Sequence, residues 1–175
     1  MYPKIGLWRD RTLWRRIGEE RIVTKPQIQV RQATESDGQG GICVIRRSIL
    51  ELCFEDHGND ERAIQEWITN KTVESWKAWL HSSQSKLLVG EIDGVLAGVG
   101  MISREGELFL LYVDPKYRFS GISKSILLSL EDTAKNWGCT SIFFESTRTA
   151  YRFYREHGYE PDQNRGQLYL LKALR

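Results

Sequence analysis

The segment Arg118–Lys124 contains a glycine, two serines and two cations, and it lies between two apolar stretches. Before it, the apolar run 108–113 predicts a buried strand, which ends at Asp114-Pro115 because proline lacks the N–H that a strand needs. A strand, a glycine turn and a helix direct unpaired backbone N–H groups, and the positive end of the helix dipole, at one point. Phosphate is the usual ligand at such a point, so we expect phosphate binding here. The helix is predicted after Gly121 from the spacing of Ile122, Ile126, Leu127, Leu130, Ala134 and Trp137.

Tyr154 is the second group suited to chemistry. It lies on the apolar face of a predicted short helix over residues 147–157, together with Ala150 and Phe153. A buried tyrosine hydroxyl needs a hydrogen-bond partner. From the residues alone, Tyr154 is therefore either a packed core tyrosine or a proton donor in a site.

The composition indicates one globular domain with a sizeable core. The chain has 175 residues, of which 41% are hydrophobic and 27% charged. The net charge of +2 is too small to indicate a nucleic-acid partner. Three cysteines without a Cys-x-x-Cys pair favour a reducing compartment, and we expect a cytoplasmic protein. Three histidines without ligand spacing predict no metal site, and we expect neither a membrane span nor a signal peptide.

The first 26 residues differ in character from the rest. They are basic and include Trp8 and Trp14. This N-terminal basic extension is expected to pack on the domain as a short helix or strap, or to be partly disordered. The alternative is a contact surface for an anion, a membrane or a second copy of the chain, and the two tryptophans favour packing, with a homodimer as one outcome. A single domain is predicted over residues 27–175.

Residues 27–175 alternate between helix-like and strand-like patterns. Polar–apolar alternation predicts a strand at 27–31. Three glycines at 38–41 are expected to delay the next helix until Ile42, and two short amphipathic helices should follow before residue 80. Strands are predicted at 87–92 and 95–102, joined by an Asp93-Gly94 turn, then at 108–113, 141–145 and 167–171. The strand at 141–145 should be parallel to the one at 108–113, because a helix separates them.

Two motifs carry a family resemblance. The order Val113-Asp114-Pro115-x-x-Arg118-x-x-Gly121-x-Ser123 resembles the acetyl-CoA-binding segment of the GNAT N-acetyltransferases. The later order Thr147-x-x-Ala150-x-x-Phe153-Tyr154-x-x-x-Gly158-Tyr159 resembles the second signature of that family. The chain is similar to small bacterial members. The resemblance implies an α/β (α+β) fold with a mixed, mostly antiparallel central sheet of six to seven strands and about four flanking helices.

The resemblance also implies an enzyme that moves an acetyl group from acetyl-CoA to a primary amine by direct attack in a ternary complex. Backbone N–H groups after Arg118 would hold the pyrophosphate, and a strand bulge would open a slot for the pantetheine arm, which pairs with strand backbone. Ser123 and Thr147 depart from the family's usual Gly or Ala and Asn. The residues implied for the co-substrate are Leu111, Tyr112, Val113, Arg118, Phe119, Ser120, Gly121, Ile122, Ser123, Lys124, Thr147 and Ala150.

For catalysis, the resemblance places Tyr154 beside the thioester sulfur as general acid, and Glu107 where several relatives carry a base. The residues leave the base open among Glu107, a water chain and a set of rivals: Glu145, Glu55, Asp56 and His57. Cys53 is either an acyl-carrying nucleophile or a packed thiol, and we expect the second.

The amine acceptor should lie over the helical region 42–80. Trp67, Trp76 and Trp79 occur there among acidic residues, which suits a cationic amine, although tryptophans in a core and acids on a solvated face would give the same pattern. Small amines, amino acids, antibiotics and protein termini all remain open as acceptors. A second hypothesis keeps the fold without catalysis, as an acyl-CoA-binding sensor or interaction module.

Overall fold

The computed structural model describes residues 26–175. The basic extension predicted over residues 1–26 therefore lies outside the described residues, apart from Pro26. The description below concerns residues 26–175 only.

Seven strands form two sheets. The first is antiparallel, in the order β1 (Ile28–Gln32), β2 (Ser85–Ile92), β3 (Val95–Ser103) and β4 (Leu108–Val113). The second is also antiparallel, in the order β5 (Ser141–Glu145), β7 (Tyr169–Ala173) and β6 (Glu160–Pro161). The predicted Asp93-Gly94 turn joins β2 to β3, with both residues at positive φ, 51° and 79°.

A bulge on β4 separates the two sheets. Met101 pairs with Leu110 whereas Ile102 pairs with Leu108, so Phe109 is an extra residue on β4. Between β4 and β5 the structure has a single parallel bridge, from Glu107 to Phe143. The predicted parallel pairing is thus limited to one end of the strands, and the bulge that the resemblance implied is present.

The helices are more numerous than predicted. Six α-helices, rather than about four, occur in residues 26–175, because the region before β2 is divided by short breaks. They are α1 (Gly38–Leu52), α2 (Phe54–His57), α3 (Glu61–Ile68), α4 (Val73–His81), α5 (Ile122–Asn136) and α6 (Arg148–Glu156), with short 3₁₀ segments at Glu35–Asp37 and Pro115–Tyr117.

The expected delay of the first helix until Ile42 is wrong. Helix α1 begins at Gly38, so the glycines lie inside it. A Cβ atom at Gly41 would lie 2.2 Å from Cζ3 of Trp76, which is fully buried. Gly38 and Gly41 therefore serve packing: they let the α4 tryptophan lie directly against the α1 backbone.

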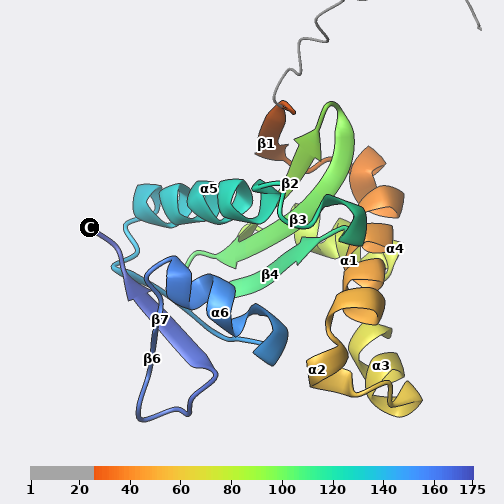
Figure 1. Cartoon of the computed structure of the whole chain (residues 1–175). Coiled ribbons are helices and arrows are strands. Elements are labelled where there is room, and N and C mark those ends of the chain that lie inside the picture. Colours follow the sequence, from red (N-terminus) through yellow and green to blue (C-terminus); the bar gives the residue numbers. More distant parts are fainter. Residues whose placement is uncertain (1–25) are drawn as a thin grey trace, which may run out of the picture.

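Helices cover both faces of the first sheet (Figure 1). Helix α5 lies on one face, and α1 and α4 lie on the other. Each face of the sheet has its own hydrophobic core, one beneath α5 (the α5 core) and one beneath α1 and α4 (the α1 core). Alternate residues of β2 point into the two cores: Leu88 packs in the α5 core, whereas Leu87 and Val89 pack in the α1 core. The prediction of a mixed, mostly antiparallel α/β fold is confirmed, and the two helical layers leave the β4 edge facing β5.

Candidate active site

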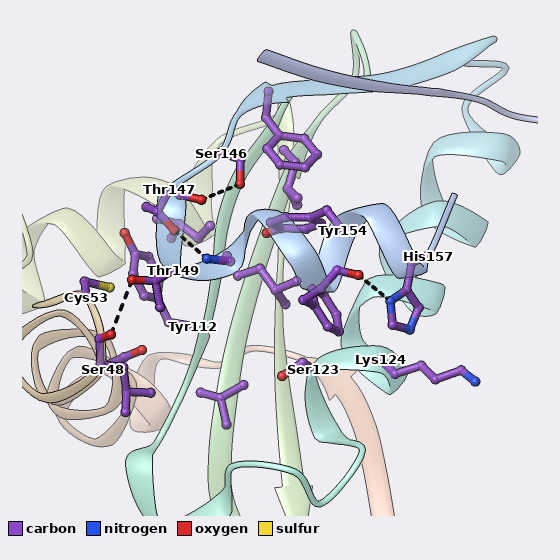
Figure 2. A pocket seen from close by; sticks show the side chains of 18 of the residues that line it. Ser48, Cys53, Tyr112, Ser123, Lys124, Ser146, Thr147, Thr149, Tyr154 and His157 are labelled. Atoms are coloured by element: carbon purple, nitrogen blue, oxygen red, sulfur yellow. Dashed lines mark hydrogen bonds between the residues drawn. The ribbon is translucent and has the colours of Figure 1, made fainter. Parts of the chain in front are cut away.

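A cavity of about 480 Å³ occupies the gap that the β4 bulge opens. Four segments line it: the end of α1, strand β4, the turn before α5, and β5 with α6. In the close-up, Ser48 and Cys53 lie to the left of Tyr154, whereas Ser123 and Lys124 lie below it (Figure 2). The lining residues are Ser48, Leu52, Cys53, Leu108–Val113, Arg118, Phe119, Gly121, Ser123, Lys124, Phe144–Thr147, Thr149, Ala150, Phe153, Tyr154 and His157.

Strand β4 offers free backbone groups to this cavity. The N–H of Asp114 donates to the carbonyl of Ala97 on β3, at 2.9 Å. Because antiparallel strands alternate, Tyr112 also faces β3, whereas the N–H and C=O of Leu111 and Val113 face the gap. An extended, peptide-like ligand can therefore pair with β4 at the two residues predicted for this contact.

The turn before α5 presents unpaired N–H groups. Phe119 and Gly121 have φ values of 62° and 92°, which turns the backbone inward ahead of the first helical residue. Within residues 26–175 the N–H groups of Phe119, Gly121, Ser123 and Lys124 donate to no protein acceptor. With Arg118 and Lys124 beside them, these groups form a cradle suited to an anion.

The side chains of Ser120 and Ile122, two residues predicted to bind the co-substrate, do not line the cavity. The Ser120 hydroxyl donates to the Tyr117 carbonyl at 2.7 Å and accepts from the Ile122 N–H at 3.3 Å. The Ile122 side chain is buried in the α5 core. Neither side chain lines the cavity, so both residues hold the turn in shape.

Tyr154 is buried among aromatic rings, with its hydroxyl lacking a protein partner in the described part of the chain. Its ring centroid lies 4.4 Å from that of Phe144 and 5.2 Å from that of Phe153. Burial is the main cause that raises the pKa of Tyr154, and the neighbouring Tyr112 adds to it. The hydroxyl therefore keeps its proton at neutral pH and is free to donate it to a ligand in the cavity.

Tyr112, one of the residues implied for the co-substrate, also makes a side-chain contact with the helical layer. Its hydroxyl accepts a hydrogen bond from Nε1 of Trp67 on α3, at 3.2 Å. Burial raises the pKa of Tyr112 to about 12. The tyrosine side chain thus ties β4 to the helical layer, a contact that strand periodicity alone could not reveal.

Helix α6 is anchored at its start by two caps. Thr147, predicted as a co-substrate residue, accepts from the Ala150 N–H at 3.1 Å through its hydroxyl oxygen. Asp56 on α2 accepts from the Arg148 N–H at 2.7 Å and from the Thr149 hydroxyl at 2.7 Å. Asp56 therefore positions the helix that carries Tyr154, and no local pattern in the sequence pairs these distant residues.

The candidate general bases differ in whether their side chains reach the cavity. Glu107 is exposed in the β3–β4 hairpin and lies outside the cavity lining, whereas Glu145 is exposed but lines it. Both ring nitrogens of His57 are engaged, with the Ile49 carbonyl at 3.0 Å and the Asn59 N–H at 3.1 Å. His57 therefore has no nitrogen left for a substrate.

His157 lines the cavity, although the sequence patterns did not single it out as a site residue. Its Nδ1 donates to the Phe153 carbonyl at 2.7 Å, which leaves the lone pair of the neutral ring on Nε2. Cys53 also lines the cavity, and burial raises the pKa of its thiol to about 12. The thiol is therefore protonated and a poor nucleophile at neutral pH.

Among residues 26–175, no three His, Cys, Asp or Glu side chains are grouped so that they could hold a metal ion. No helix in that part of the chain has the length and apolar character to cross a membrane.

Solved structures share this fold. A GCN5-related N-acetyltransferase from Rhodopseudomonas palustris has a TM-score of 0.74 at 20% identity, covering 86% of this chain and 97% of that one. The PaiA N-acetyltransferase of Thermoplasma acidophilum, in complex with coenzyme A, has a TM-score of 0.73 at 22% identity, covering 84% and 99%. The N-acetylglutamate synthase of Neisseria gonorrhoeae, complexed with coenzyme A and N-acetyl-glutamate, has 0.63 at 17%, covering 87% and 36%. The fold is therefore that of the GNAT acyltransferases.

Sequence comparison is more specific. The acetyltransferase (GNAT) domain family matches residues 54–168, which is most of the chain, so the chain belongs to the GNAT family. An amino-acid acetyltransferase of Pseudomonas syringae pv. syringae is 41% identical over 132 residues, covering 70% of this chain and 30% of that protein. The chain thus spans less than a third of the length of this curated relative.

Proposed function

We propose that the protein is an acetyl-CoA-dependent N-acetyltransferase that moves the acetyl group directly to a primary amine. One observation carries the proposal: a single cavity connects the unpaired N–H groups of the Phe119–Lys124 turn, the free edge of β4 and the Tyr154 hydroxyl. These three features suit, in that order, the pyrophosphate, the pantetheine amides and the thioester of one acetyl-CoA molecule.

The donor would be held mainly by backbone. The cradle N–H groups and the charges of Arg118 and Lys124 suit the pyrophosphate. Leu111 and Val113 suit the amides of the pantetheine arm, because their N–H and C=O groups face the gap. Bound this way, the thioester reaches the part of the cavity that Tyr154 lines.

Tyr154 would stabilise the departing thiolate. Because burial raises its pKa, complete proton transfer to a thiolate is uphill, so the contribution of the hydroxyl is a hydrogen bond to sulfur as negative charge develops. Cys53 keeps its proton, which argues against an acyl-enzyme and for direct attack. The amine must also be neutral to attack the thioester, and it can become neutral by losing its proton to water.

The acceptor end of the cavity favours a small amine, and we propose an amino acid. Ser48, Tyr112 and Thr149, three residues with uncharged side chains, line that part of the cavity. Two acids of the helical region 42–80 are engaged elsewhere: Glu51 pairs with Arg47, and Asp56 caps α6. The names of the matched Pseudomonas proteins, amino-acid acetyltransferases, support an amino-acid acceptor.

The test is a thiol-release assay with acetyl-CoA and a panel of the twenty amino acids, polyamines and a peptide amine. We expect stoichiometric CoA thiol and N-acetylated product with at least one amino acid. Acetyl-CoA binding without thiol release for any amine would instead support the binding-module hypothesis. Absence of acetyl-CoA binding would reject both.

A further inference from the structure

Phe119 is an aromatic side chain that burial does not explain. It is 94% exposed, whereas the other exposed large apolar side chains in residues 26–175 range from 45% to 56%. Its φ of 62° lies in the left-handed region, which residues other than glycine rarely adopt. A phenylalanine at such a position gains nothing from the core and has an unfavourable backbone conformation, so a ligand is the simplest reason for its ring.

Arg118 contacts one face of the Phe119 ring, and the other face is open to solvent. The guanidinium carbon of Arg118 lies 4.8 Å from the Phe119 ring centroid, a cation–π contact that orients the ring. Because the side chain is nearly fully exposed, the opposite face is open to solvent. Phe119 also lines the cavity, beside the unpaired N–H groups of the turn.

The order of chemical groups along the donor indicates which group would lie next to the Phe119 ring. Along acetyl-CoA, the order is acetyl thioester, pantetheine, pyrophosphate, ribose and adenine. If the thioester lies at Tyr154 and the pyrophosphate on the turn, the nucleoside must lie on the solvent side of the turn, where the Phe119 side chain is exposed. A purine presents a flat π-face of the kind that stacks on aromatic rings.

We propose that Phe119, backed by Arg118, is the surface on which the adenine of the donor stacks. The inference rests on the proposed function, because it takes the pyrophosphate position from it. The residue would set the preference for a nucleotide-containing donor over a shorter one.

The experiment compares two ligands by calorimetry: coenzyme A, and 4′-phosphopantetheine, which lacks the 3′-phosphoadenosine and one phosphate of the pyrophosphate. In Phe119→Ala and Phe119→Gly, the ratio of the two dissociation constants should shift about ten-fold against coenzyme A, the scale of one base–aromatic stack. Glycine accepts the positive φ whereas alanine does not, so agreement between the variants assigns the effect to the ring.

Two controls complete the design. Phe119→Trp should keep the wild-type ratio, because it retains an aromatic face. Phe54→Ala removes another exposed phenylalanine, 56% accessible and outside the cavity lining, and should leave both constants unchanged. An unchanged ratio in both ring-removing variants, or equal weakening of the two ligands, would overturn the inference while leaving the proposed function intact. A wild-type protein that binds neither ligand would overturn both.

Discussion

At the residue scale, two buried tyrosines differ in what their hydroxyls do. Tyr154 and Tyr159 both pack on Phe144, with ring centroids 4.4 Å and 5.4 Å away. The Tyr159 hydroxyl donates to Glu131 at 3.1 Å, inside the core. The Tyr154 hydroxyl has no such partner within residues 26–175 and borders the cavity. The Tyr159 hydroxyl thus makes a structural hydrogen bond, whereas the Tyr154 hydroxyl is free to contact a ligand in the cavity.

Replacing Tyr154 by Phe should therefore lower turnover while sparing the fold. We expect kcat to fall about 10²-fold, the lower end of what one hydrogen-bond donor to a developing negative charge contributes. The dissociation constant of acetyl-CoA should change less than about three-fold, because the cradle lies elsewhere. Thiol-release kinetics and calorimetry measure the two quantities.

The matched control is Tyr159→Phe. It should cost about 1 kcal/mol of unfolding free energy through the lost hydrogen bond to Glu131, with turnover close to that of the parent. If Tyr154→Phe turned over as fast as Tyr159→Phe, Tyr154 would be a core residue only.

At the scale of elements, the cavity depends on how the two sheets meet. The N–H of Phe143 donates to the Gly106 carbonyl at 3.1 Å, next to the bridge from Glu107 to Phe143. From this junction β4 and β5 separate, because the bulge at Phe109 redirects β4. The gap that receives the pantetheine in our proposal is thus set by one close contact and one extra residue.

Gly106→Ala should disrupt this junction. A Cβ atom there would lie 2.3 Å from the backbone oxygen of Ser141, at a φ of 91°. We expect a loss of roughly 2–4 kcal/mol in unfolding free energy, from the clash together with the strained conformation. Urea denaturation measures it.

Gly94→Ala is the control for backbone strain alone. Gly94 has a φ of 79°, and its Cβ would meet nothing within 4 Å. This variant should lose only about 1 kcal/mol. Equal losses in the two variants would show that the approach of Ser141 to Gly106 does not constrain the junction.

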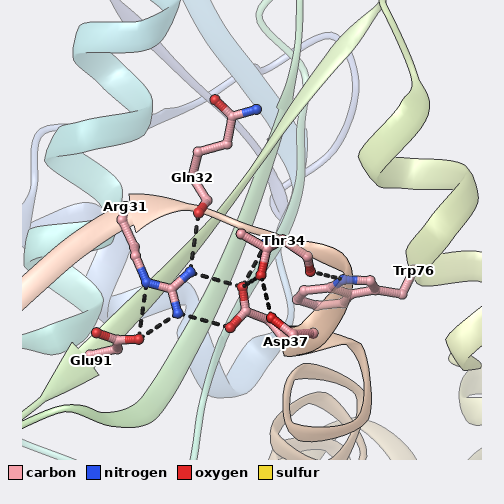
Figure 3. A network of polar contacts seen from close by, with 7 residues as sticks. Arg31, Gln32, Thr34, Asp37, Trp76 and Glu91 are labelled. Atoms are coloured by element: carbon pink, nitrogen blue, oxygen red, sulfur yellow. Dashed lines mark hydrogen bonds and ion pairs between the residues drawn. The ribbon is translucent and has the colours of Figure 1, made fainter.

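At the scale of the whole molecule, a polar network joins the first sheet to the helical layer (Figure 3). Arg31 on β1 contacts both carboxylate oxygens of Asp37 at 2.8 Å, and its Nε donates to Glu91 on β2 at 3.0 Å. Asp37 also accepts from the Thr34 N–H at 2.7 Å, and the Trp76 indole donates to the Thr34 carbonyl at 3.0 Å. Strands β1 and β2 and helices α1 and α4 thus share one network.

This network predicts sensitivity to acid. The hydrogen bonds from Arg31 are the main cause that lowers the pKa of Asp37 from 3.8 to about 2. A lowered carboxyl pKa stabilises the fold above the unfolded-state value, and that stability is lost as pH falls through the folded-state value. The window is therefore pH 4 down to pH 2, with a contribution on the order of 2 kcal/mol.

Asp37→Asn should remove this contribution. The variant should be less stable at pH 7 and should show a shallower fall in unfolding free energy between pH 4 and pH 2 than the parent. Urea denaturation at a series of pH values measures both slopes. Identical slopes would show that Asp37 does not carry the acid sensitivity.

The sequence predicts the parts of this structure that are local. The β4–turn–α5 unit follows from residues adjacent in the chain, and so does the Asp93-Gly94 hairpin. The bulge at Phe109 does not, because a bulge depends on the register of two strands and leaves no mark in the apolar run. Likewise, the contact of Asp56 with α6 joins residues 92 positions apart, and the packing role of Gly38 and Gly41 depends on Trp76, which is distant in the sequence.

In our proposal the Phe119–Lys124 turn holds the pyrophosphate of acetyl-CoA, and substitutions of Gly121 probe this contact. Calorimetry with acetyl-CoA should show that Gly121→Glu, which adds a negative charge beside the cradle, weakens binding at least about 100-fold. Gly121→Ala is the control, because it places a side chain at the same positive φ of 92° without adding a charge. Its Cβ would approach only Ile28, at 3.7 Å, so this variant should bind acetyl-CoA far better than the Glu variant. Wild-type affinity in a folded Gly121→Glu protein would show that the turn does not hold the pyrophosphate.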